Sequence, residues 1–141
     1  MDKQTSETAT SLRRSINRLS RKLRNSALGG ITPAQASLLA AIDRYENPSL
    51  GDLAVAEQVQ PPSVTRLVKT MEQAGLIACA EDTQDRRCTR VRLTPLGRKE
   101  LLAIRRRKTE FLERKLLSLS TGDQKKAHEL ASFLEMLLED E

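Results

Sequence analysis

Residues 61 to 74 carry hydroxyl and cationic side chains in a spacing that suits contact with phosphate. Val64, Leu67, Val68 and Met71 recur at three- and four-residue steps, so a helix here would have one apolar side. The opposite side carries two cations and no acid, and its residues are Pro62, Thr65, Arg66, Lys69 and Gln73. A solvated surface helix would look similar, but this combination of groups also fits a phosphate-lined groove.

The neighbouring residues predict the elements that position this face. Ser49 and Asp52 are spaced as a helix capping box, residues 58 to 60 have the length of a tight turn, and Pro61 opens a second helix that should end near Gly75. Two runs with strand character follow, residues 76–79 and 89–93, and they flank a polar connection. Two helices joined by a short turn and followed by a hairpin form a winged helix-turn-helix.

The hairpin itself predicts one buried face and one basic face. Val91 and Leu93 alternate with Arg90 and Arg92 in its second strand. Its tip carries Asp85, Arg86 and Arg87, and an arginine at such a tip can enter a minor groove, where A·T-rich stretches concentrate negative potential. The alternative is a solvated charged loop.

The chain closely resembles the MarR family of bacterial transcriptional regulators in three places: the tip, the stretch SVTRLVKTMEQAGLI (63–77) and the exit LTPLG (93–97). The resemblance covers about residues 31 to 100. It implies a DNA-binding dimer in which Asp85 holds Arg87 and leaves Arg86 nearer a phosphate. The residues that it implicates in DNA binding are Pro62, Ser63, Thr65, Arg66 and Lys69 on the recognition helix, and Asp85, Arg86, Arg87 and Arg90 in the wing.

We therefore expect a mostly α fold with a small β-hairpin wing, as a single domain over residues 1–141. Residues 31–100 should form the DNA-binding lobe, and residues 11–27 and 101–139 should form dimerisation helices, with residues 1–10 frayed. The apolar stripes of the outer helices exceed what the lobe can cover, which predicts an isologous dimer. The residues assigned to that interface are Leu12, Ile16, Leu19, Leu130, Leu134 and Leu137. The acidic end, residues 139–141, could meet the basic first helix across it.

Local signals place the remaining helix ends. Thr32 and Gln35 form a second capping box, Tyr45 extends the buried stripe of the helix that follows, and Thr94 with Pro95 opens the longest helix. The charge run at residues 105–108 is expected where this helix leaves the lobe and spans water. Thr121 is expected to cap the last helix.

Composition limits the other function classes. The net charge is +5 and the sequence pI about 9.6, which favours an anionic partner, although residues 49 to 94 hold six basic and six acidic side chains. No apolar run is long enough for a membrane span and the start lacks a secretion signal, so we expect a cytoplasmic protein. His128 is the only histidine and no Gly-rich phosphate loop occurs, so no catalytic residues, cofactor or metal site are predicted.

The expected partners are double-stranded DNA with a pseudo-palindromic operator, a second copy of the chain and, by resemblance, a small-molecule effector that makes the protein a regulated repressor. One alternative is a winged-helix module that binds a protein or RNA. Another is thiol-based redox sensing, because Cys79 and Cys88 bracket the wing on strands that should be antiparallel.

Overall fold

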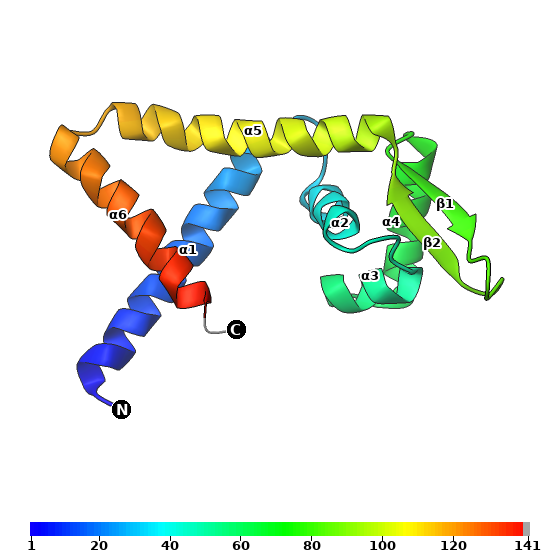
Figure 1. The fold of residues 1–141 in the computed structure, drawn as a ribbon, viewed down its shortest axis with the longest axis horizontal. Helices are drawn as coiled ribbons and strands as arrows, with labels where there is room; N and C mark the ends of the chain where they lie inside the picture. The colour runs from blue at the N-terminus through cyan, green and yellow to red at the C-terminus, as the bar shows by residue number, and fades with distance from the viewer. Residues whose placement is uncertain (140–141) are drawn as a thin grey trace.

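A computed structural model describes residues 1–139 and has six helices and one hairpin in this part of the chain. The elements in chain order are α1 (Lys3–Ala27), α2 (Pro33–Arg44), α3 (Leu50–Glu57), α4 (Pro61–Gln73), β1 (Ile77–Glu81), β2 (Thr89–Leu93), α5 (Pro95–Leu117) and α6 (Thr121–Leu138). Figure 1 shows α2, α3, α4 and the hairpin gathered at one end of α5, while α6 turns back from the other end. The predicted mostly α fold with a hairpin wing is confirmed.

The hydrophobic core lies in the lobe and the adjoining half of α5. Every buried hydrophobic residue in the described chain falls between Ala27 and Ile104. The largest fully buried side chains are Leu38, Leu39, Leu53, Met71, Ile77, Val64, Val91 and Pro48. The lobe therefore has its own packed interior, which holds α4 and the hairpin in fixed relation.

Both predicted capping boxes are confirmed. Thr32 Oγ1 accepts a bond from the Gln35 amide at 3.1 Å, and Gln35 Oε1 accepts one from the Thr32 amide at 3.1 Å. Ser49 and Asp52 make the same reciprocal pair at 3.0 Å each. Such caps satisfy amides that have no partner inside the helix, and each contributes about 1 kcal/mol.

The hairpin pairs Ile77 with Leu93 and Cys79 with Val91 in an antiparallel register. The first strand begins one residue later and ends two residues later than predicted, because its pairing runs from Ile77 with Leu93 to Glu81 with Thr89. A third stretch joins the sheet edge: the Val91 amide donates to Pro48 O at 2.9 Å, and Ser49 bridges Arg90. The base of the wing is therefore attached to the start of α3.

Three predicted helix boundaries are wrong. The first helix begins at Lys3, so residues 3–10 are helical rather than frayed, since adding residues to an existing helix is easy. Ser120, not Thr121, caps α6, with its hydroxyl accepting from the Asp123 amide at 3.1 Å. Tyr45 is 45% exposed because α2 ends at Arg44 and the extended backbone of Tyr45 turns its side chain off the helical stripe.

The charge run at residues 105–108 also has a different role from the predicted one. Arg105 Nη2 contacts Asp43 Oδ2 at 2.9 Å, and Arg107 Nη1 donates to Ala27 O at 3.1 Å. Two of its members thus bind α5 to α2 and to the end of α1. The last buried residue of α5 is Ile104, so the helix leaves the core of the lobe where this run begins, as predicted.

The outer helices are largely uncovered in the single chain. α1 buries only Ala27, and α6 buries none of its described residues. Of the residues assigned to dimerisation, Ile16, Leu19, Leu130 and Leu137 are 44–50% exposed, whereas Leu12 and Leu134 are partly buried. The predicted contact of the acidic end with α1 falls mainly on residues 140 and 141, which lie outside the described residues. Over residues 1–139, no helix is long and apolar enough to cross a membrane.

Candidate nucleic-acid interface

The outer face of α4 carries the polar residues singled out in the sequence. Val64, Val68 and Met71 are buried on the inner side of the helix. The residues predicted to contact DNA are all exposed: Pro62, Ser63, Thr65, Arg66 and Lys69. The opposite sides of one helix therefore meet the core and the solvent, as the three- and four-residue spacing predicts.

The cations of this face are free of intramolecular ion pairs within the described chain. Neither Arg66 nor Lys69 lies within 4.0 Å of a carboxylate. Glu72, the one acid of α4, accepts a bond from the Cys79 amide at 3.1 Å and is thereby held toward β1. The Thr65 hydroxyl donates to Pro61 O at 3.1 Å, so its oxygen keeps acceptor capacity on the outer side.

The turn before α4 sets its orientation against α3. Gln58 has a φ of 55°, in the left-handed region, and its amide ends α3 by donating to Val55 O. The Val59 amide then donates to Ala54 O. Pro61 and Pro62 begin α4 where their missing amide donors cost nothing. This is the geometry of a helix-turn-helix.

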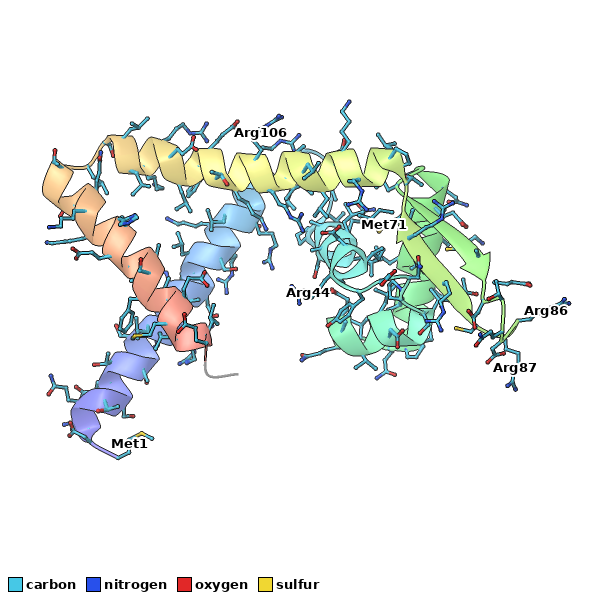
Figure 2. All side chains as sticks on the ribbon, viewed as in Figure 1. Met1, Arg44, Met71, Arg86, Arg87 and Arg106 are labelled. Atoms are coloured by element: carbon cyan, nitrogen blue, oxygen red, sulfur yellow. The ribbon has the colours of Figure 1, made fainter. Side chains whose placement is uncertain are left out.

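The wing tip has the predicted pairing. Asp85 Oδ1 accepts from the backbone amide of Arg87 at 3.1 Å and from its Nε at 3.3 Å. The Arg87 side chain is 94% exposed, and no carboxylate in residues 1–139 pairs with Arg86. Figure 2 shows both arginines projecting from the tip away from the lobe. Two guanidinium groups are thus presented to the solvent, one of them oriented by an acid.

Arg90 lies in a different environment from the one the strand pattern predicted. Its Nη1 is 3.7 Å from Asp52 Oδ2 and 3.4 Å from Asn47 O, and its Nε is 3.6 Å from Asp82 Oδ1. The hydrogen bonds from Ser49 lower the pKa of the Asp52 carboxyl, and the Arg90 charge lowers it further. Arg90 is therefore engaged at the base of the wing, whereas Arg86 and Arg87 are exposed at its tip, with Arg87 paired to Asp85.

The two cysteines are not placed for a disulfide. Cys79 lies opposite Val91, whereas Cys88 O accepts from the Asp82 amide three residues further along the hairpin. Three strand residues span roughly 10 Å, beyond the reach of a disulfide without backbone movement. Burial, and then Glu72, raise the pKa of the Cys79 thiol to about 11, which disfavours the reactive thiolate. The expectation that the two sulfurs come near each other is wrong.

Sequence reasoning missed the residues that hold the lobe together through charge. Asp43 accepts from Arg98 Nη1 at 3.2 Å and from Arg105 Nη2 at 2.9 Å, joining α2 to α5. Asp82 and Asp52 join the wing to α3 through Arg90. Apart from Asp82 and Arg90, which are 8 residues apart, these partners are 38 to 62 residues apart, so no local spacing signals the pairs.

Comparison with known proteins agrees with this geometry. The family model described as "MarR family" matches residues 31–89, which run from α2 to the first residue of β2. The helix-turn-helix and most of the hairpin are therefore similar to the MarR family. A relative described as an HTH-type transcriptional repressor, MdtR of Bacillus subtilis, is 35% identical over 68 residues, covering 48% of this chain and 44% of MdtR.

Solved structures extend the likeness beyond the lobe. A putative transcriptional regulator from Pseudomonas aeruginosa superposes with a TM-score of 0.82 at 28% identity and covers 98% of this chain and 99% of its own. A Staphylococcus aureus MepR mutant, solved bound to an oligodeoxyribonucleotide, gives a TM-score of 0.70 at 23% identity over 95% and 98% of the chains. The chain therefore shares the winged-helix fold of these structures along nearly its whole length, and its lobe is similar to MarR family regulators.

Proposed function

We propose that this protein is a sequence-specific MarR family regulator that binds double-stranded DNA as a homodimer. Two features of each lobe carry the proposal: the outer face of α4 presents unpaired cations and hydroxyls, and the wing tip presents two exposed arginines. One recognition helix reads only a few base pairs, whereas two related by a two-fold axis read half-sites about one helical turn apart. The operator should therefore be pseudo-palindromic.

Each recognition residue then has a role set by its chemistry. Arg66 and Lys69 bind phosphates or base edges in the major groove, while Ser63 and Thr65 supply short hydrogen-bonding groups beside Pro62. Arg87 enters the flanking minor groove while Asp85 holds its guanidinium group, and Arg86 contacts a phosphate. Residues 31–100 form this lobe.

The uncovered helices support dimerisation through residues 11–27 and 101–139. Besides the assigned side chains, large apolar residues of α5 and α6 are exposed: Leu116, Leu117, Phe133, Met136 and Leu138. A second copy would cover these stripes with the same surfaces. Leu130→Glu should give a monomer, whereas Val55→Glu, which alters an exposed valine on α3 outside both ranges, should stay dimeric in sedimentation velocity. Equal sedimentation of both variants with the parent chain would contradict this interface.

We further propose that the protein is a repressor, because the relative MdtR, which is 35% identical over 68 residues, is described as a transcriptional repressor. By family resemblance, a small molecule binding between the dimerisation helices and the lobe would change the spacing of the two α4 helices. Such an effector is allosteric because it prefers one spacing over another. Since the ligand is chromosomal DNA, we place the protein in the cytoplasm.

The test begins with selection of bound genomic fragments, followed by titration of the recovered operator over a range of salt. Affinity should fall steeply as salt rises, because several phosphates are contacted. Arg66→Ala should weaken binding to all sequences, and Arg87→Ala should weaken it mainly where the flanks are A·T-rich, each by about 10-fold.

Arg106→Ala is the matched control, because Arg106 lies on α5 and points away from the wing tip in Figure 2. It removes the same charge and should change affinity by less than about twofold. If all three variants bind like the parent chain, the placement of the interface is refuted. Preference for RNA or a protein over duplex DNA would replace the proposed ligand.

A further inference from the structure

A continuous series of polar contacts runs from the start of α3 to the wing tip. Asp52, in the capping box of α3, faces Arg90 Nη1 at 3.7 Å, and Arg90 Nε faces Asp82 Oδ1 at 3.6 Å. The other oxygen of Asp82 accepts from the Asp85 amide at 3.2 Å. Asp85 in turn holds the Arg87 side chain. Asp82 uses Oδ1 toward Arg90 and Oδ2 toward the Asp85 amide. Asp85 uses its amide toward Asp82 and its carboxylate toward Arg87.

Arg90 is the only member that reaches both the helix-turn-helix and the wing. Its guanidinium also donates to Asn47 O at 3.4 Å, in the loop between α2 and α3. The side chain is 39% exposed, against 94% for Arg87. Contact with DNA would require Arg90 to give up two carboxylates and a carbonyl, whereas Arg87 can reach outward without such a loss.

The backbone at the same position reinforces this attachment. The Arg90–Ser49 bridge and the bond from the Val91 amide to Pro48 O tie the base of β2 to the segment before α3. Beyond that base, the Asp82, Asp85, Arg87 and Cys88 amides make hydrogen bonds only within the connection at residues 82–88, and Asp82 forms the ion pair with Arg90. The angle of the tip therefore depends on how the base is held.

We propose that Arg90 is a positioning residue: it fixes the wing at the angle that lets Arg87 enter the minor groove while α4 occupies the major groove, and it does not itself contact DNA. This inference rests on the proposed DNA-binding function. It replaces the direct DNA contact that the alternation in β2 suggested for Arg90. Asp82 and Asp52 then help to fix the wing by pairing with Arg90.

The first test needs no DNA. Arg90→Met keeps most of the side-chain volume but removes the ion pairs, and Arg92→Met removes the same charge from an exposed strand position with no ion pair in residues 1–139. In the free protein, hydrogen exchange of the Asp85 and Arg87 amides should be about three- to tenfold faster in Arg90→Met and unchanged in Arg92→Met. Arg90→Lys should recover only part of the protection, because one ammonium cannot reach both sides as a guanidinium does. Equal exchange in Arg90→Met and the parent chain would overturn the proposal whatever the protein binds.

The second test is a double-mutant cycle on the selected operator. Arg90→Met should weaken binding about fivefold in the parent chain but less than twofold when Arg87→Ala is already present, because its effect passes through the tip. Independent losses that multiply would show that Arg90 contacts DNA directly and would overturn the proposal. If Arg90→Met speeds hydrogen exchange in the wing but leaves operator affinity unchanged, the proposed link between the wing angle and DNA binding is wrong. Absence of duplex binding by the parent chain would instead refute the proposed function, and the exchange result would still decide whether Arg90 fixes the wing.

Discussion

Gly97 permits α5 to pack directly against the turn that precedes the hairpin. A Cβ built on Gly97 would overlap the Leu76 carbonyl oxygen and lie 2.9 Å from its carbonyl carbon. That carbonyl cannot move freely, because it accepts from the Thr94 amide at 3.1 Å, and Thr94 Oγ1 caps α5 by accepting from the Gly97 amide at 3.0 Å. The added methyl group would therefore press against backbone atoms of Leu76, which cannot rotate away as a side chain could.

Gly97→Ala therefore sets two effects against each other. Helix propensity alone would stabilise the fold by up to about 1 kcal/mol. Displacing the Leu76 carbonyl costs about 1–3 kcal/mol of overpacking, and weakening the Thr94 bond costs about 1 kcal/mol more. We expect a net loss of about 1–3 kcal/mol, which lowers Tm by roughly 3 to 10 °C.

Thermal unfolding followed by circular dichroism, at one fixed protein concentration, measures this change. Gly122→Ala is the control: Gly122 is also in the first turn of a helix, but its nearest neighbour would be Ser120 Oγ at 4.0 Å. That variant should be neutral or slightly more stable. If Gly97→Ala is as stable as Gly122→Ala, helix propensity outweighs the contact and the packing argument is wrong.

Two further predictions concern titrating groups. In a Cys88→Ser background, native Cys79 should react with iodoacetamide at pH 8 roughly 100-fold more slowly than in urea, because burial raises its pKa to about 11; equal rates would refute this. The same shift should make stability fall as pH rises from about 9 toward 11, since the folded state retains the proton longer. The hydrogen bond from Arg105 lowers the pKa of Asp43 from 3.8, so this pair stabilises the fold above that pH and the contribution is lost as pH falls through the lowered pKa. In urea melts the stability difference between the parent chain and Asp43→Asn should therefore shrink toward pH 2, and a difference independent of pH would contradict the pairing.

The helix-turn-helix was predictable because its signals are local. A capping box such as Ser49 with Asp52 satisfies amides within three residues, and the spacing of Val64, Val68 and Met71 fixes which side of α4 is buried. The pairing of Asp85 with Arg87 spans two residues and was also foreseen. Which of these exposed groups contact DNA remains a prediction.

The errors arose where distant segments decide the outcome. Arg90 alternates with Val91 as a solvent-facing strand residue should, yet the first turn of α3 and the hairpin connection each bring an acid to it. Arg105 and Arg107 look like part of a solvated run until α2 and the end of α1 provide an acid and a carbonyl. Cys79 and Cys88 bracket the wing in sequence, but the strand register separates them.

The amino-acid sequence by itself determined where the helices form, which face of α4 is apolar and which family the chain resembles, because backbone caps and side-chain periodicity act within a few residues. Only the tertiary structure decided which cations are free and which are paired. Ion pairs depend on the distance between charges, and the distances from Arg90 to Asp52 and from Arg105 to Asp43 are set by packing segments 38 and 62 residues apart in the chain.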